Sequence, residues 1–234
     1  ATSLMAPASL AEWCGSQRLP LKPVAGFLPL KAPISLSTVQ PEDEGDLFDV
    51  SMFMDRQISA KRSVGLCVDT TVRQDEHRLF EASEWEDYDV KVVSLPCSPP
   101  LPAPSQALVE EVPSEAMVSK FCAAVEEYWS NPRHRTRHIA VVCVTGINIS
   151  GYLICQYLIR SVRWTPERAI TEFATSRPPG VYLPEMTTIL TPSLKPPAPP
   201  AWHALPAGAQ APAGAKRKPP SLTREMQPPP PKKP

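Results

Sequence analysis

The chain of 234 residues lacks the features that define several large classes of protein. It contains no run of about 18 or more apolar residues, which excludes an ordinary transmembrane helix. It has only 9 glycines and no repeating glycine triplet, which excludes collagen. The 24 basic and 24 acidic residues cancel, so the overall charge indicates no nucleic-acid partner. The amino end lacks the apolar core of a signal peptide, and we expect an intracellular protein with no membrane partner.

Cysteine is scarce, and its spacing suits neither a disulfide framework nor a metal site. Cys67 and Cys143 lie in apolar, strand-like runs, and Cys122 and Cys155 lie in helix-like runs. There is no Cys-x-x-Cys pair, and the 4 histidines have no metal-ligand spacing with the 6 cysteines. The sequence therefore predicts reduced thiols, no bound metal and no other cofactor.

Proline, in contrast, is abundant and unevenly placed. Residues 195–234 hold 13 of the 31 prolines, with seven basic residues and one acidic residue. This end of the chain therefore carries a net charge of +6, and residues 1–194 carry −6. We predict an irregular segment over 1–22, a globular domain over 23–190 and a proline-rich basic tail over 191–234. The tail is either a disordered linker or a segment that docks on a partner or on RNA.

The globular part alternates strand-like and helix-like segments. Apolar runs predict buried strands, and amphipathic stretches with capping residues predict helices. The predicted strands are 63–69, 88–95 and 139–143, and the predicted helices are 47–56, 114–130, 152–162 and 166–176. The segment 23–31 is predicted to pack as an extended arm. Strands joined by helical crossovers predict an α/β fold with a central, largely parallel sheet flanked by helices.

One predicted strand–loop–helix element carries chemistry. The strand 139–143 ends in Cys143, and the loop that follows, 144–151, contains Gly146 and Gly151. Backbone N–H groups of such a loop, together with the positive end of the next helix, bind a phosphate dianion. The same field favours the thiolate form of a cysteine and makes it a nucleophile.

Five segments give this element a specific resemblance. The loop 142–151 resembles the sequence His-Cys-Thr-His-Gly-Phe-Asn-Arg-Thr-Gly of the RNA 5′-triphosphatase domain of metazoan-type mRNA capping enzymes. The segments 23–31, 68–71, 152–155 and 177–182 resemble further motifs of that domain, in the same order and with roughly the same spacing. The resemblance runs from about Trp13 to Tyr182. It implies a cysteine-phosphatase fold of the dual-specificity and tyrosine phosphatase type, a metal-independent site and a nuclear location. A mitochondrial location is the alternative.

The resemblance also assigns roles to individual residues. Cys143 corresponds to the nucleophile, and Ser150 to the hydroxyl that hydrogen-bonds its thiolate. Asp69 corresponds to a carboxylate needed for activity, with a role as general acid left open. The residues that match the phosphate-binding positions are Gly146, Asn148, Gly151 and Arg177.

Two departures from the resemblance break the site. Ile149 stands where the arginine of the loop is expected, and Val142 stands where the histidine before the cysteine is expected. An arginine there grips two phosphate oxygens with its planar fork, whereas isoleucine supplies no donor. The sequence therefore predicts an inactive pseudophosphatase that serves as a structural or binding module with RNA or a ribonucleoprotein assembly.

Other interpretations remain open. In an active RNA 5′-triphosphatase, Cys143 would attack the γ-phosphate, and a substitute cation, Arg177, Arg73 or Lys31, would have to reach the loop. The third hypothesis is a protein tyrosine phosphatase, which needs the missing arginine as well. The basic connector 133–138 is predicted to be either a solvated segment or an RNA-binding patch.

Overall fold

The computed structural model describes residues 16–34, 48–71, 79–97 and 110–201. Most of the predicted irregular segment 1–22, the start of the resemblance near Trp13, most of the predicted tail and the candidate cation Arg73 lie outside these ranges.

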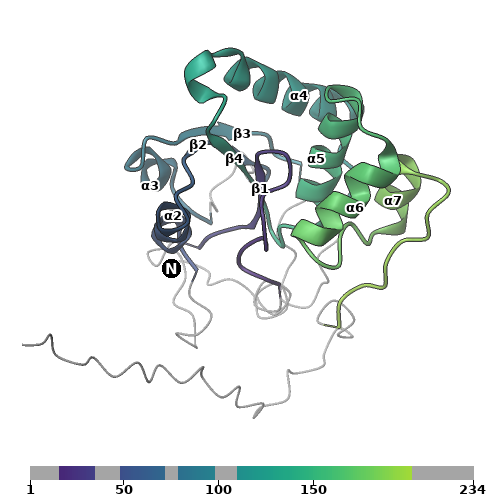
Figure 1. Ribbon diagram of the computed structural model, residues 1–234. Helices are drawn as coiled ribbons and strands as arrows, with labels where there is room; N and C mark the ends of the chain where they lie inside the picture. Colours follow the sequence, from purple (N-terminus) through teal and green to yellow (C-terminus); the bar gives the residue numbers. More distant parts are fainter. Residues whose placement is uncertain (1–15, 35–47, 72–78, 98–109, 202–234) are drawn as a thin grey trace, which may run out of the picture.

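The core of the described chain is a four-stranded parallel sheet (Figure 1). Its strands stand in the order β1 (Phe27–Lys31), β4 (His138–Cys143), β2 (Val64–Asp69) and β3 (Lys91–Ser94). In the register, Cys143 lies opposite Lys31, and Val142 lies opposite Asp69. Because the strands are parallel, their carboxyl ends bring these residues to one edge of the sheet.

The segment 23–31 was predicted as an extended arm, and this prediction was wrong in its last five residues, which form the edge strand β1. All five residues of β1 are buried, because both faces of the sheet are covered. Pro29 lacks a backbone N–H, and an edge strand tolerates that loss. The sequence pattern did not predict this strand, because proline and glycine in the segment are typical of irregular structure.

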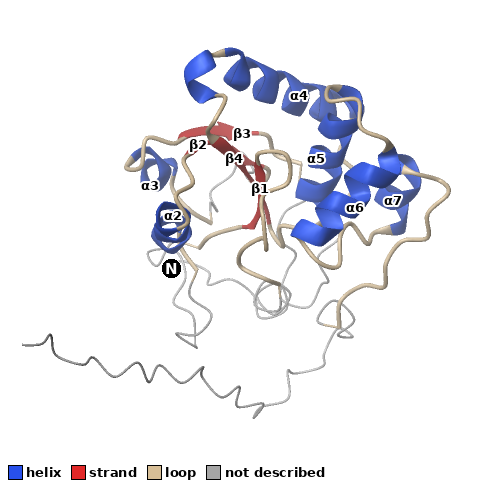
Figure 2. Ribbon diagram, in the orientation of Figure 1, coloured by secondary structure: helices blue, strands red, loops and turns tan. Residues whose placement is uncertain are grey.

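Helices cover both faces of the sheet (Figure 2). The helices α4 (Glu115–Ser130), α5 (Asn148–Arg160), α6 (Pro166–Ser176) and α7 (Pro184–Leu190) lie on one side. The helices α2 (Val50–Ser59) and α3 (Ala82–Glu86) lie on the other. Alternate residues of β4 enter the two cores, so Cys143 faces the first group of helices and Val142 the second. The predicted fold class, a parallel sheet flanked by helices, is confirmed.

Local sequence signals explain where several helices begin. Ser114 caps α4 by accepting a hydrogen bond from the Met117 amide at 3.4 Å, and Thr165 caps α6 by accepting one from the Arg168 amide at 3.3 Å. Both caps were predicted and are confirmed. The helix predicted over 47–56 runs instead from Val50 to Ser59, after the cap Asp49. Sequence reasoning did not predict the short helices α3 and α7.

The predicted start of α5 at Tyr152 was wrong, since the helix begins at Asn148. The Gly151 amide already donates to the Ile147 carbonyl at 2.9 Å. Ile149, Ser150 and Gly151 therefore belong to the first turn of α5. A loop of four residues, Val144–Ile147, joins β4 to this helix.

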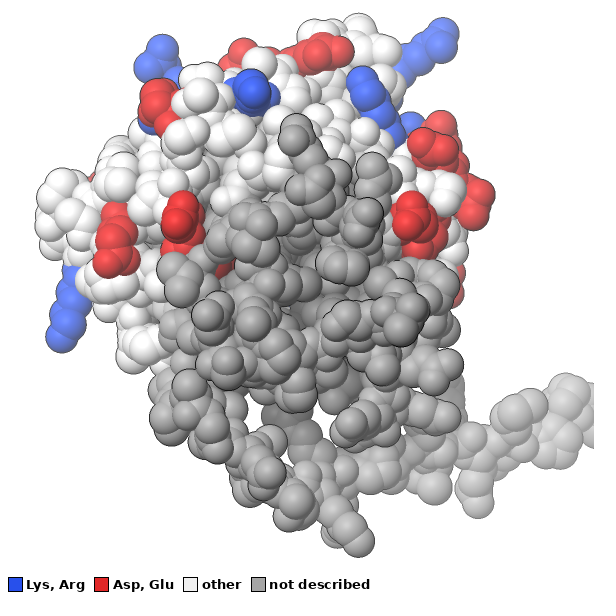
Figure 3. All heavy atoms as spheres, turned by 180° about the vertical axis from the view of Figure 1, so that it is seen from behind, with Lys and Arg blue, Asp and Glu red and all other residues white. Residues whose placement is uncertain are grey.

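Charge is mixed over the described surface seen from behind, where acidic and basic side chains are interspersed (Figure 3). The longest helix in the described ranges, α4, has 16 residues, and no helix of these ranges is long and apolar enough to span a bilayer.

Candidate active site

The candidate site is the turn that follows Cys143 at the carboxyl edge of the sheet. Gly146 adopts a positive φ of 70°, which disfavours side chains at this position. A Cβ on Gly146 would lie 2.3 Å from the Lys31 amide nitrogen and 2.8 Å from Nη2 of Arg177. The tight turn therefore requires glycine, because the backbone of β1 and a buried guanidinium occupy the space around it.

Cys143 forms two hydrogen bonds with the residues that follow it, but with Ser150 the thiol is the donor. The Gly146 amide donates to its Sγ at 3.2 Å, and the thiol donates to Oγ of Ser150 at 3.5 Å. The side chain is fully buried, however, and burial raises the pKa of the Cys143 thiol. The negative charge of Glu110 raises this pKa further, and the hydrogen bonds with Ser150 and Gly146 lower it only in part. The thiol is therefore protonated at neutral pH and is a poor nucleophile.

Arg177 lies at the loop and is also fully buried. Its Nε donates to the Gly146 carbonyl at 3.0 Å, and its Nη2 donates to the carbonyls of Thr145, at 2.8 Å, and Gln17. Burial lowers the pKa of Arg177 to about 10, so the guanidinium stays charged at neutral pH. Nε and Nη2 thus hold the turn in place through its carbonyls, rather than being directed at a phosphate.

The two apolar replacements in the loop are part of the packed interior. Ile149 is fully buried and belongs to the core that α4, α5, α6 and α7 form with one face of the sheet. Val142 is fully buried in the core on the opposite face. Hydrocarbon thus fills both positions that the sequence resemblance matches to polar groups of a phosphatase loop.

Asn148 was predicted to bind phosphate, and the structure gives its side chain three protein partners. Its Nδ2 donates to Oε2 of Glu110 at 2.5 Å. Its Oδ1 accepts from the amides of Tyr182 at 3.1 Å and Leu183 at 3.4 Å. Asn148 therefore ties the start of α5 to the α6–α7 connection and to the segment before α4.

Glu110 is the residue of this site that sequence reasoning missed. It brings a carboxylate to the start of α5, where an anionic substrate would be expected. The only signal in the sequence was an acidic pair, Glu110-Glu111, shortly before the cap of α4, and an acidic pair is common on protein surfaces.

Asp69 and Lys31 lie at the same edge of the sheet. Oδ1 of Asp69 accepts hydrogen bonds from the Thr71 amide at 2.8 Å and from the Thr71 hydroxyl at 2.6 Å, which stabilises the turn after β2. Lys31 is buried, and its Nζ donates to the Ser16 carbonyl at 3.4 Å. Both residues have structural contacts, and the role of Asp69 as a general acid stays a prediction.

Gly151 was also predicted to shape the phosphate loop. It lies in α5, where a Cβ would come within 2.5 Å of a ring carbon of Phe173 and 2.7 Å of a methyl carbon of Val181. The absence of a side chain at Gly151 therefore permits the close packing of α5 against α6.

The described ranges contain no group of three or more histidine, cysteine, aspartate and glutamate side chains placed to hold a metal ion. All five cysteines in these ranges are free thiols.

Comparison with known proteins supports the resemblance seen in the sequence. The chain is 32% identical over 162 residues to an mRNA-capping enzyme of Danio rerio, covering 69% of this chain and 25% of that protein. It is 30% identical over 149 residues to an RNA/RNP complex-1-interacting phosphatase homolog of Caenorhabditis elegans, covering 63% of this chain and 59% of that protein. Among solved structures, PTPMT1 in complex with PI(5)P aligns with a TM-score of 0.48 and 16% identity, over 72% of this chain and 90% of that chain. The chain matches no protein-family model.

These comparisons confirm the predicted resemblance: the homologues of this chain are mRNA-capping enzymes and RNA/RNP complex-1-interacting phosphatases. The chain spans about a quarter of the length of the capping enzyme and 59% of the length of the phosphatase homolog.

Proposed function

Since the chain is homologous to mRNA-capping enzymes and to RNA/RNP complex-1-interacting phosphatases, we propose that it is an inactive cysteine-phosphatase domain that serves as a binding or structural module in an RNA–protein assembly. One observation carries the proposal: Ile149, which the sequence resemblance matches to the phosphate-gripping arginine, lies fully buried in the core. Its nuclear location, or alternatively a mitochondrial one, and the docking of the proline-rich tail on a partner belong to the same proposal.

The energetics of the loop support inactivity. Loss of one preorganised donor to the transition state costs about 10²–10³ in rate, and loss of a bidentate cation costs at least as much. The raised pKa of Cys143 removes most of the thiolate at neutral pH. Glu110 adds a negative charge that repels an incoming phosphate. The missing arginine affects transition-state stabilisation, the raised pKa affects nucleophile activation, and the charge of Glu110 affects phosphate binding.

The alternative, an active RNA 5′-triphosphatase, has its own support. Cys143 retains its contacts with Gly146 and Ser150. In the described part of the chain, Nη1 of Arg177 and Oγ1 of Thr145 are buried without a hydrogen-bond partner. If the turn opened, these two groups would be free to meet phosphate oxygens, and Arg177 would be the substitute cation.

The deciding experiment is phosphate release from 5′-triphosphorylated RNA without metal, with the natural chain compared with Cys143→Ser. We expect both proteins to release phosphate only at the background rate, because the natural thiol is neither ionised nor aligned with a bound phosphate. Release by the natural chain that Cys143→Ser abolishes would overturn the proposal and establish the alternative.

A further inference from the structure

The carboxylate of Glu110 lies at the start of α5, the helix that follows the loop after Cys143. Asn148, whose Nδ2 donates to Oε2 of Glu110 at 2.5 Å, is the first residue of this helix. Two residues further on, Oγ of Ser150 lies 3.5 Å from Sγ of Cys143. Glu110 thus stands beside the first turn of α5, and its charge acts on the Cys143 thiol.

The start of α5 lacks a side-chain acceptor of its own. The first amides of a helix have no acceptor within the helix, and the side chain of the N-cap residue usually supplies one. The N-cap of α5 is Ile147, which forms no side-chain cap hydrogen bond. Because α5 has 13 residues, the partial positive charge at its start favours an anion nearby. The carboxylate of Glu110 brings this end of the helix the negative charge that its N-cap lacks.

The donor that faces Glu110 is held in one orientation. Oδ1 of Asn148 accepts hydrogen bonds from the amides of Tyr182 and Leu183, at 3.1 and 3.4 Å. These two bonds require the carbonyl oxygen of the side chain on that side, so the amino group must point towards Glu110. The donor is therefore in place before any acceptor arrives, which lowers the cost of binding one.

The segment 110–114, here called the strap, is anchored independently of this contact. Val112 packs against the core that contains Cys143, and Pro113 is buried. Directly after the strap, Oε2 of Glu115 accepts a hydrogen bond from Nη2 of Arg160, at the end of α5, at 2.8 Å. The strap therefore keeps its place over α5 when the side chain of Glu110 is changed.

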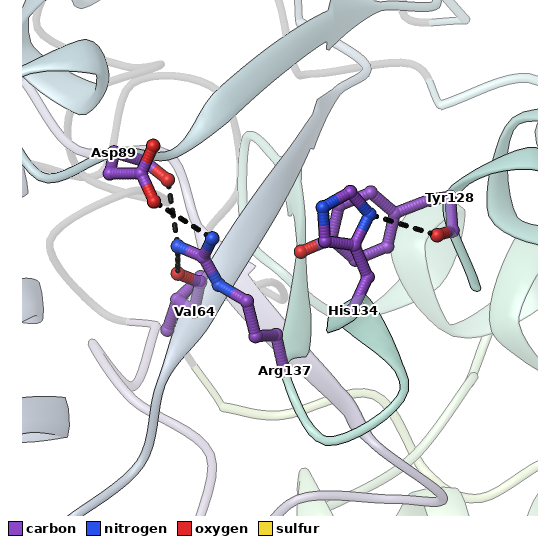
Figure 4. A network of polar contacts seen from close by, with 5 residues as sticks. All are labelled: Val64, Asp89, Tyr128, His134 and Arg137. Atoms are coloured by element: carbon purple, nitrogen blue, oxygen red, sulfur yellow. Dashed lines mark hydrogen bonds and ion pairs between the residues drawn. The ribbon is translucent and has the colours of Figure 1, made fainter. Parts of the chain in front are cut away.

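A second carboxylate with a side-chain partner lies at the opposite, amino-terminal edge of the sheet (Figure 4). Oδ2 of Asp89 lies 2.8 Å from Nη1 of Arg137, whose Nη2 donates to the Val64 carbonyl at 2.8 Å. Beside this pair, the rings of His134 and Tyr128 stack with centroids 4.4 Å apart. Asp89 is thus neutralised by a cation, whereas Asn148 offers Glu110 a neutral donor. The Asp89 pair provides a control that is remote from Cys143.

We propose that Glu110 is a built-in occupant of the anion position at the start of α5, and that the strap is an autoinhibitory contact that keeps external anions out of the loop. The inference rests on the proposed inactive domain. It adds a reason, separate from Ile149, why the loop takes no phosphate. It also makes a specific claim: once the Glu110 side chain is removed, a small external carboxylate takes its place.

The test measures the rate at which iodoacetamide alkylates Cys143 in the full chain, at a fixed pH near 8, by mass spectrometry of the labelled peptide. Glu110→Ala is compared with the natural chain in sodium formate and in sodium chloride of the same ionic strength. Glu110→Gln removes the charge but keeps the volume of the side chain. Glu111→Ala removes the neighbouring exposed carboxylate, and Asp89→Asn removes the paired one at the other edge.

We expect Glu110→Ala to be alkylated about 2–10-fold faster than the natural chain in chloride, because the thiolate of Cys143 no longer faces a negative charge. Formate should reverse this gain, by about two-fold at a concentration that fills half of the sites. Glu110→Gln should also react faster but should not respond to formate, because its amide still fills the position. The natural chain, Glu111→Ala and Asp89→Asn should react alike in the two salts.

The proposal is wrong if formate leaves the rate of Glu110→Ala unchanged, or if it slows Glu111→Ala or Asp89→Asn equally. Circular dichroism shows whether Glu110→Ala folds; if it does not, Glu110→Gln decides, and alkylation of that variant at the natural rate refutes the proposal. No turnover is measured, so this result is separate from the proposed function. Phosphate release from triphosphorylated RNA would refute the inactive domain, whereas a missing formate response without any release would refute the built-in occupant alone.

Discussion

The substitution Ile149→Arg introduces the residue that a phosphatase loop requires, and the structure predicts that it lowers the free energy of unfolding. Ile149 is fully buried in the hydrophobic core and has no surface exposed to solvent. An arginine there places a charge among apolar core side chains, and an uncompensated buried charge costs about 3–5 kcal/mol. Because whole domains are stable by only about 5–15 kcal/mol, the variant should lose a large share of its free energy of unfolding.

Urea denaturation followed by tryptophan fluorescence measures this loss. Ile149→Val is the matched control, since it removes one methylene and should cost only about 0.5–1.5 kcal/mol. Each protein is measured with and without inorganic phosphate, which would stabilise an arginine that faces an anion site. An Ile149→Arg variant that is as stable as the natural chain, and further stabilised by phosphate, would refute the claim that hydrocarbon packing has replaced the anion site.

Three further predictions concern other parts of the chain. Glu110→Gln should lower the pKa of Cys143 and speed alkylation of this thiol at a fixed pH near 8, because a neutral amide no longer disfavours the thiolate. Mass spectrometry of the labelled peptide at a series of pH values measures the alkylation rate. Unchanged rates would contradict the prediction. Gly65→Ala should lower the free energy of unfolding, measured by urea denaturation, by about 1–3 kcal/mol, because the new methyl group forces the Tyr128 hydroxyl aside. Adding Tyr128→Phe to the same chain should recover part of that loss. Additive losses would show that the two positions are independent. Ser114→Ala should cost about 1 kcal/mol through loss of the α4 cap, whereas Ser114→Asp should retain the stability.

The sequence was sufficient to predict the parallel sheet, because buried parallel strands are written as short, continuous apolar runs. It also located the caps Ser114 and Thr165, since these depend on residues adjacent in the chain. It predicted a loop after Cys143 but made it four residues too long, because α5 begins at Asn148. The edge strand β1 was missed as a strand because Pro29 and its flanking residues suggest irregular structure, and only pairing with β4 reveals it.

The environment of the site could not be derived from the pattern. The bond from Asn148 to Glu110 joins residues 38 positions apart, and the bonds from Arg177 to Thr145 and Gly146 join residues more than 30 apart. Such contacts depend on how the segments meet in space. The same holds for the pKa of Cys143, which the loop motif alone would lower and which burial and Glu110 raise.

The most direct test of the central claim, that the loop no longer binds an oxyanion, is calorimetric titration of the natural chain with tungstate, a phosphate-like dianion. The account predicts no saturable heat at millimolar concentrations and no protection of Cys143 from alkylation. Saturable binding that protects Cys143 would contradict it, because the loop would then hold an anion over the thiol despite Ile149.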